Sequence, residues 1–87
     1  MHALFSKQFR KKYKLLPEAI RLHFNERLVL FISNQSNPVL NMHPLHGTWI
    51  GHRSINVTGS YRAIYYHINK DTVMFVAIGT HPELYGE

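Results

Sequence analysis

The chain has 87 residues, so we expect residues 1–87 to form a single domain with a modest core. It contains no cysteine, which excludes disulfide bonds and thiolate metal sites. Ten Lys and Arg against five Asp and Glu give a formal charge of +5 at pH 7 with histidine neutral. This balance favours a polyanion or an acidic protein as the partner.

The N-terminal stretch MHALFSKQFRKKYK lacks the apolar segment of a signal peptide. The longest apolar run, at 28–32, is too short to cross a bilayer. We therefore expect a cytoplasmic protein that does not enter a membrane.

The first segment has a helical spacing of apolar residues, at Phe5, Phe9, Tyr13 and Leu16. The steps of four, four and three predict a helix over residues 5–16, capped by Ser6 or the residue before it. Basic residues such as Lys11 and Lys12 fall mostly off this apolar face. They form either a solvated helix surface or a ridge that contacts RNA phosphates.

Pro17 and Glu18 mark the start of a second helix, because proline and an acidic residue both suit a first turn. Its apolar stripe runs to about Asn34 and contains Ile20, Phe24, Leu28 and Phe31. Residues 5–34 thus predict a helical hairpin. The turn-rich exit at 33–38 leads into a structured loop with proline and glycine breaks.

The second half reads as β structure, with candidate strands at His52–Val57, Tyr61–Ile68 and Thr72–Thr80. Hairpin turns at 58–60 and 69–71 join them. The predicted fold is α+β, with the helical hairpin packed on one face of a small antiparallel sheet. Residues 1–4 are a candidate edge strand, and a short helix closes the chain.

Alternation along the strands sorts side chains between the two faces of the sheet. In the first strand His52, Ser54 and Asn56 should face away from the helices. Arg62 shares the parity of the isoleucines in the second strand, which is unexpected for a surface arginine. At the start of a strand its guanidinium either binds a phosphate or pairs with Glu83 or the C-terminus.

The chemistry-bearing residues are histidines and arginines. The five carboxylates are scattered, and no phosphate-binding or nucleophile motif occurs. RNA cleavage by attack of a 2′-hydroxyl on its own phosphate needs a base, an acid and a cation, which imidazole and guanidinium groups supply. The spacing of His43 and His46 is a weak zinc signal, so we predict no metal and no cofactor.

Residues 43–86 contain four landmarks: HPLxG, GxR, YRxIY and the terminal GTHxELYG. Together they resemble the RelE/ParE superfamily of bacterial toxins, nearest its YafQ branch. The resemblance implies a RelE-like fold and a ribosome-dependent endoribonuclease, or mRNA interferase. Its implied partners are mRNA in the ribosomal A site, ribosomal RNA and a cognate acidic antitoxin.

The resemblance also implies site residues. His81 of GTH and His43 of HPLxG match acid/base groups, Tyr85 matches an aromatic that contacts RNA, and Arg62 matches an arginine that stabilises the phosphate. Tyr61 matches a neighbouring aromatic that stacks on a base. The predicted RNA-contacting set is His46, His52, Arg53, Asn56, Tyr61, Lys11 and Lys12.

Three positions depart from the YafQ pattern. Ala77 stands where an arginine is typical, Asn56 where a histidine is, and Ser60 where an aspartate is. Either Arg62 compensates or the chain is a weakened nuclease that only binds its antitoxin. A ParE-like toxin that inhibits gyrase is the other alternative, although gyrase binding does not require histidines at these positions.

Overall fold

The computed structural model describes residues 1–86. Its elements follow the chain in the order β1 (His2–Phe5), α1 (Lys7–Leu15), α2 (Glu18–Ser33), η1 (Pro38–Leu40), β2 (His43–Pro44), η2 (Gly47–Trp49), β3 (Arg53–Asn56), β4 (Tyr61–Asn69), β5 (Thr72–Thr80) and α3 (His81–Tyr85). The predicted helical hairpin, the three C-terminal strands and the closing helix are confirmed, although β3 is two residues shorter than predicted. The two 3₁₀ turns, η1 and η2, lie in the predicted loop.

The sheet has five strands in the order β1-β5-β4-β3-β2. Strands β2 to β5 pair antiparallel, whereas β1 runs parallel to β5, with His2 opposite Thr72. The expectation of an antiparallel sheet is therefore wrong at this edge, and the sheet is mixed. The reason is topological, since the helical hairpin connects β1 to the other strands across one face of the sheet.

Helix α1 begins two residues later than its apolar spacing predicts. Phe5 belongs to β1 and pairs with Phe75, and Ser6 is the N-cap of the helix. The Phe9 N–H donates to Ser6 Oγ at 3.0 Å, so the predicted cap is present although the boundary differs. Pro17 precedes α2 at its N-cap position.

The hydrophobic core lies between the helices and one face of the sheet. Its aromatic members pack ring against ring: Phe5, Phe9, Phe24, Phe31, Tyr65 and Phe75. Burial of one such side chain contributes roughly 1.5–3 kcal/mol. This face therefore anchors the fold and leaves the opposite face for other contacts.

The two sheet faces divide as alternation predicts for β3, where Ile55 and Val57 join the core and Asn56 does not. In β4 the core face consists of Ala63 and Tyr65. Arg62 therefore has the non-core parity, which it shares with Ile64 as expected. Ile64 is also fully buried, but it is not part of the main core.

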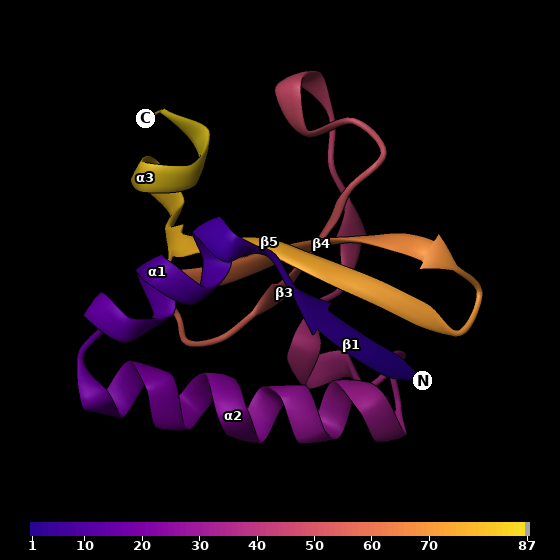
Figure 1. The fold of residues 1–87 in the computed structure, drawn as a ribbon, viewed down its shortest axis with the longest axis horizontal. Coiled ribbons are helices and arrows are strands. Elements are labelled where there is room, and N and C mark those ends of the chain that lie inside the picture. The colour runs from indigo at the N-terminus through magenta and orange to yellow at the C-terminus, as the bar shows by residue number, and fades with distance from the viewer. Residues whose placement is uncertain (87) are drawn as a thin grey trace.

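The non-core face is covered in part by the loop that follows η1. In Figure 1, α2 lies below the sheet, while α3 and the loop around residues 45–52 rise on the other side. The Leu45 N–H donates to the His52 carbonyl at 2.9 Å, which closes this loop on itself. The fold thus brings the loop and the C-terminal helix to one side of the sheet.

Candidate active site

A cleft of about 460 Å³ lies on the side of the sheet away from the core. Its walls come from the loop after η1, from the start of β4 and from α3. The lining residues are Asn41, His43, Pro44, Leu45, His46, Arg62, His81 and Tyr85. All four side chains predicted to be catalytic therefore line one cleft, together with His46 from the predicted RNA-contacting set.

Both ring nitrogens of His43 have neighbours. Nδ1 lies 2.8 Å from the carbonyl oxygen of Asn41, and Nε2 lies 3.4 Å from Ser54 Oγ. Because a carbonyl oxygen only accepts, Nδ1 carries the proton of the neutral ring and Nε2 holds the lone pair. His43 is exposed, and its Nε2 faces the hydroxyl of Ser54.

Asn41 and Ser54 were not assigned to the site from the sequence. Asn41 has the left-handed conformation, with φ of 46°, which suits asparagine and aims its carbonyl at His43. Ser54 is directly opposite His43 in the β2–β3 pairing and is fully buried. The only sequence signal for this contact was the predicted non-core parity of Ser54.

Arg62 is held by the backbone of the preceding turn. Its Nη1 donates to the carbonyl oxygens of Thr58, Gly59 and Tyr61, at 2.9, 3.1 and 3.1 Å. Within residues 1–86, no carboxylate pairs with this guanidinium, and Glu83 pairs with Lys12 instead. The C-terminal carboxylate, the other partner considered for Arg62, lies outside the described residues. Arg62 lines the cleft, and a guanidinium there is a group that can bind a phosphate.

Helix α3 supplies two side chains one turn apart. The ring centroids of His81 and Tyr85 lie 4.5 Å apart with an interplanar angle of 61°. Residues at i and i+4 share a helix face, and both of these line the cleft. The His81 N–H donates to the Ser60 carbonyl at 3.3 Å, which fixes the start of α3 near the β3–β4 turn.

A capping box starts α3. Thr80 is the N-cap and Glu83 is its reciprocal partner, while Gly86 ends the helix with φ of 73°. Lys12 forms a hydrogen bond with Glu83 and, together with the Thr80 bonds, lowers the pKa of this carboxyl to about 2. The acid of α3 is thus ionised at neutral pH.

The remaining predicted RNA-contacting residues are dispersed. Tyr61 packs against the core, so it lies on the other face from the cleft. Arg53 is exposed and donates to Met42 Sδ at 3.5 Å. His52 forms ring contacts with Trp49 and Tyr66, at 5.3 and 5.4 Å between centroids. The structure does not bring these three side chains into the cleft.

Asn56 sits beside Arg62 in the β3–β4 pairing, and its Oδ1 is buried with no hydrogen-bond partner among the described residues. Lys11 and Lys12 lie on α1, and Lys12 is engaged by Glu83 at 2.9 Å. Across residues 1–86, no group of three His, Asp or Glu side chains is arranged to hold a metal ion. The described helices include none that is long and apolar enough to span a membrane.

A comparison with protein-family models shows which family the chain belongs to. Residues 1–86 match the model described as the bacterial toxin of type II toxin-antitoxin systems, YafQ. The chain belongs to the YafQ toxin family. It is therefore a toxin of the type II toxin-antitoxin class, and the sequence resemblance to the YafQ branch is confirmed.

Solved structures agree with YafQ membership. YafQ from E. coli strain BL21(DE3) is 27% identical, with a TM-score of 0.81 over 97% of both chains. YafQ in the E. coli DinJ-YafQ toxin-antitoxin complex is 28% identical, with a TM-score of 0.77 over 97% of this chain and 96% of that one.

A YoeB/ParE toxin from Agrobacterium tumefaciens is 15% identical, with a TM-score of 0.76 over 93% of this chain and 99% of that one. At this identity the match shows the shared fold alone. The α+β architecture of this YafQ-family chain is thus shared with that toxin. A search of curated protein sequences finds no match.

Proposed function

We propose that this YafQ-family toxin is a cytoplasmic, ribosome-dependent endoribonuclease that cleaves mRNA in the ribosomal A site. One observation carries the proposal: a single cleft is lined by His43, His81 and Arg62. These groups supply a base, an acid and a phosphate-binding cation, the set that RNA cleavage by its own 2′-hydroxyl requires.

In the proposed reaction the 2′-oxygen attacks the adjacent phosphorus, and the bond from phosphorus to the 5′-oxygen breaks. One of the two imidazoles takes the proton of the 2′-hydroxyl, and the other gives a proton to the departing 5′-oxygen. Arg62 stabilises the extra negative charge on the phosphorane. The products are a 2′,3′-cyclic phosphate and a 5′-hydroxyl, and no water or metal is consumed.

Arg62 takes the part that an arginine at position 77 plays in the YafQ pattern. Ala77 pairs with Ile64, and Arg62 pairs with Gly79 two residues further along β5. The two positions are thus on the same face of neighbouring strands. Arg62 lines the cleft, so Ala77 does not by itself remove the transition-state cation.

Tyr85 is proposed to contact the RNA from α3, with its ring packed at the edge of His81. His46, His52, Arg53, Asn56, Tyr61, Lys11 and Lys12 are the wider proposed RNA-contacting set, of which His46 lines the cleft. Of the others, the exposed Lys11 and Arg53 are the best placed for contacts with ribosomal RNA, which surrounds a protein in the A site. Tyr61 packs against the core, the Oδ1 of Asn56 is buried, and Lys12 is paired with Glu83.

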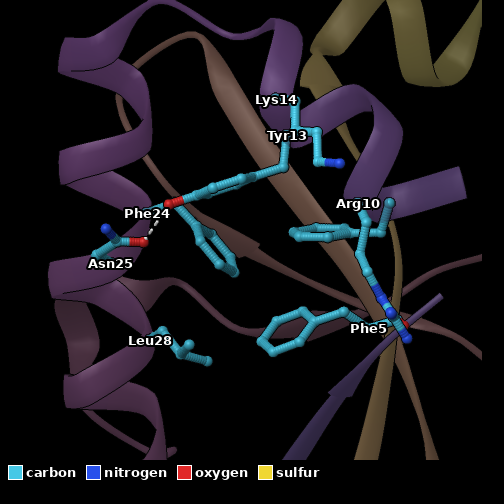
Figure 2. A pocket seen from close by; sticks show the side chains of 8 residues that line it. Phe5, Arg10, Tyr13, Lys14, Phe24, Asn25 and Leu28 are labelled. Atoms are coloured by element: carbon cyan, nitrogen blue, oxygen red, sulfur yellow. Dashed lines mark hydrogen bonds between the residues drawn. The ribbon is translucent and has the colours of Figure 1, made fainter. Parts of the chain in front are cut away.

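The second proposed partner is an acidic antitoxin. A largely apolar cleft of about 410 Å³ lies between α1 and α2, with Phe9 and Phe24 at its buried floor. Figure 2 shows Arg10 and Lys14 at its edge, together with the 2.7 Å hydrogen bond from Tyr13 Oη to Asn25 Oδ1. Helix α1 contains no acidic residue.

An acidic segment with an apolar anchor fits this site, because the anchor enters the aromatic hollow while carboxylates meet the basic rim. The E. coli relative has been solved in complex with its antitoxin DinJ. We therefore propose that a cognate acidic antitoxin binds the helical hairpin. Failure of this chain to co-purify with a co-expressed acidic neighbour would count against the proposal.

A second candidate function is a weakened toxin that only engages its antitoxin, which Ala77, Asn56 and Ser60 favour. A translation reaction with purified ribosomes separates the two. We expect new mRNA fragments from the wild-type chain with ribosomes and none without them. A gyrase supercoiling assay run in parallel isolates the ParE-like alternative, and inhibition there without RNA cleavage would overturn the nuclease.

A further inference from the structure

The C-terminal helix that supplies His81 and Tyr85 needs external support. It has five residues, and an isolated helix of this length does not form in water. Two of its contacts to the rest of the fold are the His81 N–H to the Ser60 carbonyl and the Trp49 Nε1–H to the Leu84 carbonyl, at 3.3 and 3.0 Å. The position of the two cleft side chains therefore depends on how α3 is held.

Glu83 gives α3 a further set of contacts, to Thr80 and to Lys12. Its Oε1 accepts from the Thr80 N–H at 2.8 Å and from the Thr80 hydroxyl at 3.0 Å, while its own N–H donates to Thr80 Oγ1 at 3.4 Å. Gly79 leaves room for the carboxylate, since a Cβ there would lie 3.1 Å from Glu83 Oε1. The capping box thus fixes the Glu83 carboxylate through contacts within α3 and its N-cap.

The second carboxylate oxygen points to α1. Glu83 Oε2 accepts from Lys12 Nζ at 2.9 Å, which joins residues 71 positions apart in the chain. Exposed ion pairs usually contribute little, because two long side chains must be ordered for one contact. Here the capping box has already ordered Glu83, so only Lys12 loses freedom when the pair forms.

We propose that the Lys12–Glu83 ion pair is a positioning element of the candidate active site, which clamps α3 onto α1. The clamp holds His81 and Tyr85 in the wall of the cleft that also contains Arg62. This inference rests on the proposed nuclease for its effect on cleavage. It assigns Lys12 to the support of α3 instead of direct contact with RNA.

Trp49 provides a readout that needs no catalysis. It is the only tryptophan of the chain, so its indole N–H gives one resolved NMR signal, and its bond to the Leu84 carbonyl reports whether α3 is docked. In Lys12→Met we expect this signal to shift and its exchange with solvent to accelerate. Lys12→Arg should retain the wild-type signal, because arginine restores the ion pair.

The cleavage assay then tests the consequence. In Lys12→Met we expect kcat for ribosome-dependent cleavage to fall about three- to tenfold with KM unchanged, since a displaced α3 misplaces reacting groups. Lys12→Arg should recover most of the loss. Lys70→Met removes the same charge from the β4–β5 turn and is the matched control, with neither the indole signal nor kcat affected.

The outcomes separate this inference from the proposed function. An unchanged indole signal in Lys12→Met would overturn the clamp whether or not the wild type cleaves RNA. A rise in KM with kcat unchanged would also overturn it, because that pattern belongs to a residue that binds RNA. If the wild type does not cleave, the nuclease fails, and the indole signal still decides whether the pair holds α3.

Discussion

The ring of Tyr85 packs edge-on against the imidazole of His81, with 4.5 Å between the ring centroids. The two residues are one helical turn apart on α3 and line the same cleft. An aromatic neighbour at this distance restricts the orientations of the imidazole. Strand β5 ends at Thr80, which caps α3, so His81 and Tyr85 are the first and last residues of that helix.

Tyr85→Ala should lower ribosome-dependent cleavage by about 10- to 100-fold, because His81 loses the ring that orients it and RNA loses a stacking surface. Tyr85→Phe keeps the ring and should remain within about threefold of wild type. Single-turnover cleavage rates of the two variants give the comparison. Equal losses in both would show that the phenol hydroxyl, and not the ring, is the active part.

Arg62→Ala should reduce cleavage by about 10²- to 10³-fold, since the phosphorane loses its cation. Introduction of Ala77→Arg into that variant should restore part of the activity, because position 77 lies on the same sheet face. Lys70→Ala controls for the loss of one positive charge. Full activity in Arg62→Ala would remove this residue from the proposed chemistry, and thermal unfolding of each variant checks the fold.

We predict that the Glu83 carboxylate makes the free energy of unfolding depend on pH in the acid range. Its pKa is lowered from 4.5 to about 2, first by the Lys12 hydrogen bond, so the folded state favours the ionised form. The stabilisation is fully present above pH 4.5 and is lost as the pH falls towards 2. Denaturant unfolding of wild type and Glu83→Gln should therefore differ at pH 7 and converge near pH 2. A difference that is independent of pH would contradict this assignment.

For Tyr65 we predict that the stability of the fold decreases at high pH. Burial raises its pKa to about 12, partly offset by the charge of Arg53, and its Oη has no hydrogen-bond partner among the described residues. The folded state favours the neutral phenol, so wild-type stability should fall as the pH rises from 10 to 12.

Tyr65→Phe should remove that alkaline loss and be neutral or stabilising by up to about 1 kcal/mol at pH 7, because a buried hydroxyl without a partner contributes no hydrogen bond. Unfolding free energies at pH 7 and pH 11 provide the test. Destabilisation by more than about 1 kcal/mol at pH 7 would show that the hydroxyl is satisfied in solution.

Helix α1 was predictable because its apolar residues repeat with a helical period. Helix α2 has a weaker pattern, since Leu22, Val29 and Ile32 are exposed, and its stripe through Phe24 and Phe31 identified it. The parallel pairing of β1 was not predictable, since four residues carry alternation but no direction. Strand β2 was missed because it consists of His43 and Pro44 alone, and a proline argues against a strand. Its position at the sheet edge, opposite Ser54 and Arg53, is what tolerates that proline.

The cleft residues came from the family resemblance, and their partners came only from the structure. Lys12 and Glu83 are 71 residues apart, so no local pattern links them. Ser54 was assigned to the non-core face, yet it is fully buried because this face has its own cover from the loop after η1. We expected Tyr61 beside the site. Successive side chains of a strand point to opposite faces, so Tyr61 packs against the core while Arg62 lines the cleft.

The proposed nuclease is tested by induction of the wild-type chain and of His81→Ala in bacteria, followed by mapping of mRNA 5′ ends. We predict growth arrest with new cuts in reading frame, bearing 5′-hydroxyl ends, in the wild type alone. General acid/base loss should reduce the cuts in His81→Ala by about 10²- to 10⁴-fold. Equal arrest in both strains without new cuts would contradict the nuclease and place the target elsewhere.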